Sequence, residues 1–210
     1  MTSIRFPLLH LQAAALFAAK KDIRYYLQGV LCERRAGVVR LVGTDGSILA
    51  VLTSDLDKGN DVPDAAYIIP LDDVTRLIKA MPKSLWSIDL TPTKDDAGYI
   101  SSPSLHALGS PVLFKPVDGT FPDWRRVIPR GETVPCAAQF NTDLLAPFTK
   151  AARLLGSKVS NPYVHHAGEG GALVTLPTED FVGVVMPLRE RSMSDARDTR
   201  AAAVRMALGE

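Results

Sequence analysis

The chain is poor in the residues that mark several protein classes. It has 2 cysteines in 210 residues, Cys32 and Cys136, and they lack the close pairing of a zinc site. We therefore expect no disulfide framework, two small buried apolar thiols and a reducing, cytoplasmic location. The 24 Lys and Arg nearly balance the 23 Asp and Glu. A net charge of +1 neither indicates nor excludes a nucleic-acid partner, so any DNA affinity must come from local clusters of bases.

Long hydrophobic runs are also missing. The most apolar stretch, residues 8–19, contains His10 and Gln12 and is followed by Lys20 and Lys21 where a signal peptide needs a small-residue cleavage site. No run approaches the roughly 20 apolar residues of a membrane span. A composition of 46% hydrophobic and 22% charged residues is typical of a globular protein.

Signatures of catalysis and metal binding are absent as well. We find no Ser-His-Asp arrangement, phosphate loop or dinucleotide fingerprint. His165 and His166 are neighbours that would face opposite sides of a strand, and the glycines after them indicate a hairpin turn. Asp45 is followed by Gly46, and an Asp-Gly pair is typical of a tight turn, so the presence of this aspartate needs no catalytic role. The sequence therefore predicts no catalytic residue, no metal and no cofactor, and an enzyme is the less favoured hypothesis.

A short strand that leads directly into a helix occurs three times. The strands end at Pro7, Pro70 and Asn141, with spacings of 63 and 71 residues, which indicates an internal repeat. The strands are residues 4–7, 67–70 and 138–141, and the helices begin at residues 8, 71 and 142. Segments rich in β-forming residues follow each helix: 25–33, 38–52, 86–90, 98–101, 111–115, 162–166, 172–176 and 181–188.

This order predicts an α+β fold of three β-α-β-β-β units, each with one helix on an antiparallel sheet. Asp45 and Gly46 tolerate the positive φ angles of a tight turn, so we expect a hairpin between 39–43 and 48–52. Residues 191–210 are rich in Ala and Arg, with Ser194 and Asp195 as a candidate N-cap, and predict an appended helix.

The apolar residues of the second and third helices recur at helical spacing and predict their buried sides. The two stripes are Leu71, Val74, Leu77, Ile78 and Met81, and Leu144, Leu145, Phe148, Ala152 and Leu155. Pro147 costs one intrahelical bond if the third helix starts at Asp143, so a start near Ala146 is the alternative.

Bases lie opposite both stripes, and the first helix is expected to end in Lys20 and Lys21. The opposite-face bases are Arg76 and Lys79 in the second helix, and Lys150 and Arg153 in the third. Lys and Arg solvate exposed helix faces in many proteins, so this pattern alone is weak evidence for DNA.

Four motifs together resemble the bacterial DNA polymerase sliding clamp family, the β subunit of polymerase III. They are Arg24-Tyr-Tyr-Leu27, Thr44-Asp-Gly46, Phe121-Pro-Asp-Trp-Arg-Arg-Val127 and Val184-Val-Met-Pro187. The resemblance implies a DNA-clamp fold in a shortened form. Residues 1–130 are similar to its complete middle domain, 131–190 to the second half of its last domain, and 191–210 form a helical tail. The first clamp domain and the first half of the last domain have no counterpart.

The resemblance implies a cleft that binds short peptides of polymerases and repair proteins. Leu, Val, Met and Pro suit a groove for hydrophobic anchors, although each residue taken singly is also an ordinary core residue. Ser47 and Ile48 depart from the His-Arg pair usual in the family, which puts partner choice there in question. The implied cleft residues are Leu27, Thr44, Gly46, Leu49, Pro122, Val127, Val184, Met186, Pro187 and Leu188, with Arg126 and Arg189 at the rim.

The resemblance also implies a DNA surface with a tyrosine pair. Tyrosine stacks on exposed bases and reaches phosphates, and lysine or arginine contacts to phosphate are independent of sequence and sensitive to salt. We expect only one of the two tyrosines to be open to a partner. The candidate DNA contacts are Lys20, Lys21, Arg24, Tyr25, Tyr26, Arg76, Lys79, Lys150 and Arg153.

The expected function is that of a non-enzymatic accessory factor in DNA replication. As a processivity factor it would contact or encircle duplex DNA and present the cleft to a DNA polymerase. Clamp rings of the family contain twelve half-units, so three units per chain would need four chains, and self-association is expected. The alternative is an interaction module that has lost ring closure and competes for, or adapts, clamp-binding partners.

Overall fold

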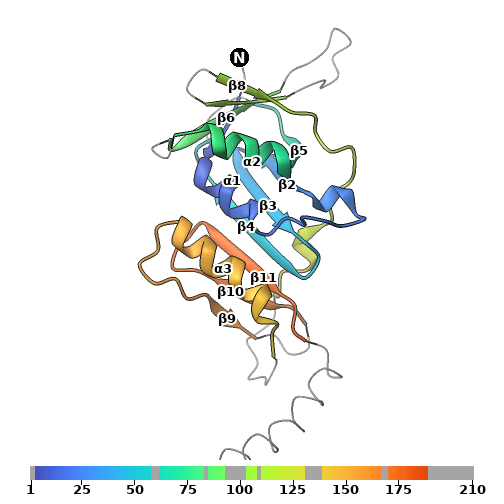
Figure 1. Cartoon of the computed structure of the whole chain (residues 1–210), viewed down its shortest axis with the longest axis vertical. Helices are drawn as coiled ribbons and strands as arrows, with labels where there is room; N and C mark the ends of the chain where they lie inside the picture. The colour runs from blue at the N-terminus through green and yellow to red at the C-terminus, as the bar shows by residue number, and fades with distance from the viewer. Residues whose placement is uncertain are drawn as a thin grey trace, which may run out of the picture.

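The computed structural model describes residues 3–57, 62–82, 85–92, 103–107, 110–130, 139–166 and 170–188 (Figure 1). Within them lie two antiparallel sheets and three helices, which is the α+β fold expected from the sequence. The helices are α1 (Leu8–Ala15), α2 (Leu71–Ala80) and α3 (Thr142–Leu154). The strands are β1 (Ile4–Pro7), β2 (Gly29–Arg35), β3 (Val38–Thr44), β4 (Ile48–Ser54), β5 (Ala65–Pro70), β6 (Ser87–Thr91), β7 (Ser104–Ala107), β8 (Ser110–Leu113), β9 (Tyr163–His165), β10 (Ala172–Thr175) and β11 (Phe181–Val185).

The elements form three repeated units, of which the first two have the predicted β-α-β-β-β order and the third, within the described residues, has no strand before its helix. We call them unit A (β1, α1, β2, β3 and β4), unit B (β5, α2, β6, β7 and β8) and unit C (α3, β9, β10 and β11). The first sheet has the order β1-β6-β7-β8 and the second the order β5-β2-β3-β4-β11-β10-β9. Units A and B therefore exchange their first strands, because β1 pairs with β6 and β5 pairs with β2. Unit C extends the second sheet through the β4–β11 pair.

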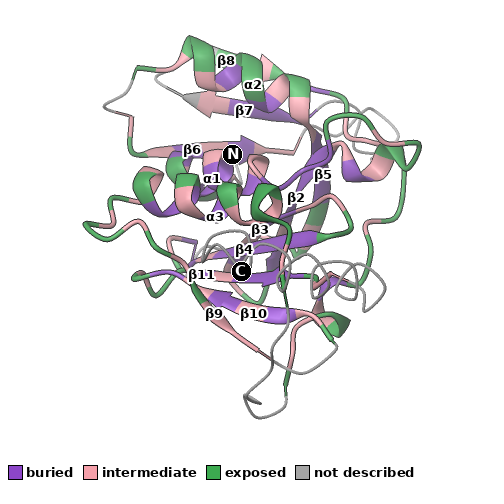
Figure 2. Cartoon of the chain, turned by 60° about the horizontal axis from the view of Figure 1, so that its bottom comes forward, coloured by how far each residue is buried: buried purple, intermediate pink, exposed green. Residues whose placement is uncertain are grey.

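The main core lies between the helices and the sheets. The three helices stand on one side of the strands in Figure 1, and Figure 2 shows buried residues gathered in the central strands. Phe17, Phe148 and Phe181 join units A and C, and the rings of Phe17 and Phe148 meet edge to face with centroids 4.8 Å apart. Gly43 allows α1 to approach β3, because a Cβ there would lie 2.0 Å from the carbonyl oxygen of Ala14.

A second, smaller core covers the opposite face of the seven-stranded sheet. Its buried members are Leu31, Val42, Leu49, Val51, Ile68, Trp124 and Val184. Residues of the 116–130 segment pack over it, among them Val117, Phe121 and Ile128. This segment leads away from unit B and carries the short 3-10 helix η2 (Trp124–Arg126) across the sheet. The functional site described below is built on this second core.

Two sequence expectations are wrong in their boundaries. The first helix ends at Ala15 rather than at the lysines, because the chain turns to bury Phe17 in the core. Residues 25–27 form the 3-10 helix η1 (Tyr25–Leu27) instead of starting a strand, and β2 begins only at Gly29. The third helix begins at Thr142, as predicted, and not near the alternative Ala146, since the Asn141 side chain caps it by accepting a bond from the Asp143 N–H at 2.9 Å.

Other expectations are confirmed or lie outside the described residues. Val74 and Leu77 in α2, and Phe148 and Ala152 in α3, are buried on the predicted sides. Cys32 is buried, and burial raises the pKa of its thiol. Cys136, the 98–101 strand and the 191–210 helix fall outside the described residues. The strand predicted over 138–141 is not confirmed, because residues 139–141 lie in no strand and residue 138 falls outside the described residues. No helix within the described ranges is long and apolar enough to cross a membrane.

Candidate functional site

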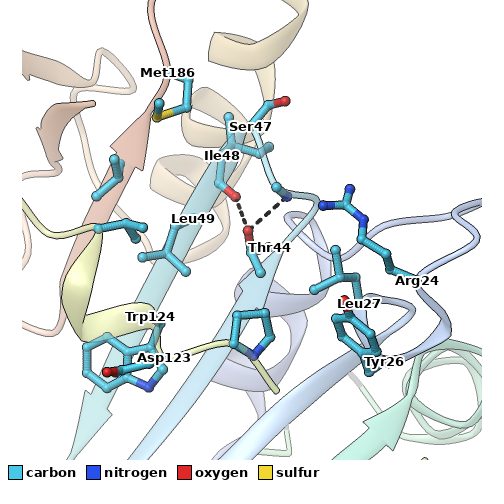
Figure 3. Close-up of a pocket in the computed structure, with 14 residues that line it drawn as sticks. Arg24, Tyr26, Leu27, Thr44, Ser47, Ile48, Leu49, Asp123, Trp124 and Met186 are labelled. Carbon is cyan, nitrogen blue, oxygen red and sulfur yellow. Dashed lines mark hydrogen bonds between the residues drawn. The ribbon is translucent and has the colours of Figure 1, made fainter. Parts of the chain in front are cut away.

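An apolar pocket of about 190 Å³ opens where four separate segments meet (Figure 3). The β3–β4 hairpin, η1, η2 and the end of β11 each contribute side chains. Units A and C and the 116–130 segment therefore build it together. Its lining residues are Arg24, Tyr26, Leu27, Thr44, Gly46, Ser47, Ile48, Leu49, Pro122, Asp123, Trp124, Val127, Val184 and Met186.

The β3–β4 turn forms one rigid wall of the pocket. The Thr44 hydroxyl donates to the Ile48 carbonyl at 2.7 Å and accepts from the Gly46 N–H at 3.0 Å (Figure 3). The Asp45 carboxylate accepts bonds from the Ser47 and Ile48 N–H groups at 2.8 and 2.9 Å. Gly46 has a φ of 94°, the left-handed conformation that glycine adopts at little cost. The Thr-Asp-Gly sequence thus fixes the turn through its own side chains.

Arg24 sets the charge at one side of the pocket. Its guanidinium pairs with Asp22 at 2.6 Å and donates to the Asp45 carbonyl at 3.0 Å. A Cβ at Gly46 would lie 2.8 Å from this guanidinium, so the glycine also lets Arg24 cross the turn. Hydrogen bonds from Arg24 lower the pKa of Asp22 to about 2. Arg24 is therefore engaged with the loops of the pocket.

The floor of the pocket is apolar, and its mouth is apolar and open. Leu27, Leu49 and Val184 form buried parts of the lining. Val127 is 51% exposed and Met186 is 42% exposed, although both are apolar and line the same pocket. Exposed apolar side chains around a concave surface are typical of a site that buries a ligand.

Trp124 anchors the η2 segment to the sheet. It is only 8% exposed and packs in the second core, yet its indole N–H has no hydrogen-bond partner among the described atoms. The Arg125 guanidinium lies 4.1 Å from the centre of its ring and pairs with Glu33 on β2. The Asp123 side chain accepts a bond from the Arg125 N–H at the start of η2. These contacts hold Pro122 and Val127 at the pocket.

The structure brings together eight of the twelve residues expected in the cleft: Leu27, Thr44, Gly46, Leu49, Pro122, Val127, Val184 and Met186. Arg126, Pro187 and Leu188 do not line the pocket, and Arg189 lies outside the described residues. Sequence reasoning missed Ser47, Ile48, Asp123 and Trp124, which are chain neighbours of expected residues. It assigned Arg24 and Tyr26 to DNA, whereas both line this pocket.

The other candidate DNA contacts lie on the exposed sides of the described elements. Arg76 and Lys79 are exposed on α2, and Lys150 and Arg153 on α3. Arg76 also pairs with Asp73 at 2.6 Å, which lowers the charge it offers. Lys20 and Lys21 are exposed beyond the end of α1.

The tyrosine pair is divided between solvent and core. Tyr25 is 56% exposed, whereas Tyr26 packs against the second core. Tyr25 is thus the more open of the two, Tyr26 lines the pocket, and any contact with DNA stays a prediction.

The two adjacent histidines do not form a metal site in the described part of the chain. The His165 ring lies 2.9 Å from the Thr175 hydroxyl, and the His166 ring packs on Phe140. No group of three or more His, Cys, Asp or Glu residues within the described ranges is arranged to hold a metal ion.

Comparison with curated proteins finds bacterial β sliding clamps. The chain is 36% identical to the β sliding clamp of Proteus mirabilis over 143 residues, which are 67% of this chain and 36% of that protein. It is 32% identical to that of Vibrio cholerae over 156 residues, or 72% of this chain and 39% of that protein. The chain thus matches little more than a third of the length of these relatives. No family model matches it.

Solved sliding-clamp structures have the same fold. The crystal structure of the Pseudomonas aeruginosa DNA polymerase sliding clamp with ligand aligns with a TM-score of 0.67 at 18% identity, covering 89% of this chain and 66% of that one. The Bacillus subtilis sliding clamp aligns with a TM-score of 0.68 at 16% identity, covering 89% and 64%. Sequence and fold agree, and the chain belongs to the family of the bacterial β sliding clamp.

Proposed function

We propose that this protein is a non-enzymatic, clamp-like accessory factor that holds a short hydrophobic peptide of a DNA polymerase or repair protein in the pocket of Figure 3. The observation that carries the proposal is the open apolar mouth. Val127 and Met186 are half exposed, whereas the residues around them are fixed by the Thr44 turn and by Trp124. A preformed groove binds a peptide without a large ordering cost.

The shape and charge of the pocket support a peptide with apolar anchors. Leu27, Leu49 and Val184 offer an apolar floor, and Met186 can adapt to anchors of different shape. Arg24 at the rim favours a polar residue beside the anchors, because its guanidinium is held in a fixed position by Asp22, although this pairing lowers the charge it offers. Ile48 is buried and uncharged at a turn where the family usually has a His-Arg pair. We therefore expect the hydrophobic anchors of the peptide to contribute most of the affinity.

The second part of the proposal is sequence-independent contact with duplex DNA through the helical side. Lys150 on α3 and Lys79 on α2 are exposed on helices that stand on the same side of the strands (Figure 1). Such contacts release counterions, so the affinity would fall steeply with salt. In this proposal residues 1–130 act as one complete clamp-like domain and 131–190 as a half-domain.

Binding of a labelled clamp-binding peptide, followed by fluorescence anisotropy, tests the pocket. Met186→Ala removes apolar area that a bound peptide would cover, and we expect about tenfold weaker binding. Leu113→Ala is the control, because Leu113 is 62% exposed on β8 and does not line the pocket. Equal peptide affinity in both variants would show that this pocket is not the binding site.

A chain that cannot close a ring would be the alternative, an interaction module that competes for clamp-binding partners. Three units per chain require four chains for twelve units. Light scattering decides between the two proposals: a tetramer supports the ring, whereas a monomer that still binds the peptide supports the module.

A further inference from the structure

A backbone hydrogen bond joins the two ends of unit C at the same positions as in unit B. The Val117 N–H donates to the Ile68 carbonyl at 3.0 Å, and the Leu188 N–H donates to the Gln139 carbonyl at 2.8 Å. In both bonds the donor lies 49 residues after the acceptor, and the acceptor lies three residues before the helix of its unit. Residues 139–188 are therefore the structural equivalent of residues 68–117, with α3 in the place of α2 and β9 in the place of β6.

Unit A completes unit B by exchanging its first strand with it and by packing a helix against its helix. β1, which precedes α1, pairs with β6 over four residues, and β5, which precedes α2, pairs with β2 over six. Helices α1 and α2 contact each other across the join. The two units thus bury each other's first strand, second strand and helix in a nearly two-fold arrangement.

No equivalent mate lies between unit B and unit C in the sequence. Only residues 131–141 separate Arg130 from α3, whereas the elements of units A and B extend over residues 4–54 and 65–113. Within the described residues β9 is the last strand of the seven-stranded sheet, and nothing pairs with its outer edge. Tyr163 on β9 is 54% exposed. An open strand edge beside an apolar side chain is a surface that soluble proteins normally cover or protect with charge.

We propose that a second copy of this chain completes unit C around a two-fold axis. The residues directly before α3 of each copy would lie beside β9 of the other, as β1 lies beside β6 within the chain. The two α3 helices would pack as α1 and α2 do. Each copy offers the same two surfaces, the open edge of β9 and residues 139–141, which belong to no strand of their own chain, so one symmetric contact satisfies both.

The charges on α3 fit this arrangement. A two-fold axis perpendicular to the helices makes them antiparallel, which sets the first turn of one α3 against the last turn of the other. Asp143 is exposed in the first turn and Arg153 in the last. The acidic start of each helix thus meets the basic end of its partner, with the helix dipoles also opposed.

The proposed joint deepens the ring proposal but stands without it. Two joined chains would present a complete domain between two copies of units A and B, and two such pairs would supply the twelve units of a ring. A dimer that does not assemble further would contradict the ring, while the joint, the peptide pocket and its peptide affinity would be unaffected.

Light scattering on the full chain tests the joint. We expect at least a dimer, about 45 kDa from two chains of 22.7 kDa each. Tyr163→Lys places a charge at the β9 edge and should raise the dimer dissociation constant at least about tenfold. Leu113→Lys on the β8 edge is the matched control and should leave this dimer intact, because Leu113 is similarly exposed at 62% but lies on another sheet. A monomer at all concentrations, or dissociation by Leu113→Lys alone, would overturn the proposal.

A charge exchange tests the helix arrangement independently of the strand edge. Asp143→Arg should weaken the dimer because it faces Arg153 of the second copy, and Asp143→Arg combined with Arg153→Asp should restore it. Both positions are exposed, so circular dichroism should report folded protein in each variant. A double variant as weak as the single one would contradict the antiparallel packing of α3.

Discussion

Placing a carboxylate at Val127 should remove peptide binding while leaving the fold intact. Val127 is 51% exposed, so its substitution leaves no cavity in the core and gives a solvated charge in the free protein. It lines the pocket together with Met186 and Val184, and a bound peptide would cover its exposed half. The substitution should therefore weaken peptide binding without lowering the stability of the folded chain.

The magnitude follows from two contributions. Full burial of a valine side chain is worth about 1.5–3 kcal/mol, so the half that a peptide would cover contributes about 1 kcal/mol. Removing a carboxylate from water without a partner adds about 1–3 kcal/mol. The sum of about 2–4 kcal/mol corresponds to peptide binding at least about 30-fold weaker.

Anisotropy titration with a labelled clamp-binding peptide measures this change, and the chain offers a closely matched control. Val159 is 50% exposed and does not line the pocket, so Val159→Asp makes the same chemical change at equal exposure. We expect Val159→Asp to bind the peptide like the unmodified protein. A loss of less than threefold for Val127→Asp, or an equal loss for both variants, would refute the assignment of the pocket.

Three further predictions concern the fold and the DNA surface. Gly43→Ala should lower the free energy of unfolding by about 1–3 kcal/mol in thermal melts, because its Cβ would meet the Ala14 carbonyl; an unchanged melting temperature would contradict the close approach of α1 to β3. Burial lowers the pKa of His10 in the folded protein, so the unfolded chain binds more protons and stability should fall as pH drops below about 6.5. His10→Gln should lack that pH dependence, and a persistent fall would assign it to other groups. Lys79→Ala with Lys150→Ala should reduce the slope of DNA affinity against salt by about 1–2, whereas the loss of Arg35 and Lys115 should not; equal effects would indicate non-specific attraction.

The sequence was a reliable guide where local chemistry decides the structure. The Thr44-Asp-Gly46 turn is made by its own side chains, and α2 follows directly from the spacing of Val74 and Leu77. The resemblance of the motifs to a known family, rather than hydrophobic periodicity, predicted that Leu27, Val127 and Met186 line one pocket. Leu27 and Met186 lie 159 residues apart in the chain, and nothing in local propensity relates them.

Where the sequence prediction failed, contacts between residues far apart in the chain determine the local structure. The strand expected over residues 25–33 gave way to η1 at Tyr25–Leu27, where Tyr26 packs against the second core and Arg24 is held by Asp22. Arg24 was expected at DNA because it is a base beside a tyrosine pair, whereas its partners are visible only in the folded chain. The extension of one sheet from unit A into unit C also depends on the β4–β11 pair, which no short motif encodes.

The central claim, that a peptide binds in this pocket, can be tested through the fluorescence of Trp124. The chain has 2 tryptophans, and Trp86 is 62% exposed whereas Trp124 lines the pocket and is 8% exposed. In a Trp86→Phe variant all tryptophan emission comes from Trp124. We predict that a clamp-binding peptide without tryptophan changes this emission with a saturable titration, and that Val127→Asp in the same background abolishes the change. Unaltered Trp124 emission at peptide concentrations that saturate anisotropy would contradict the account.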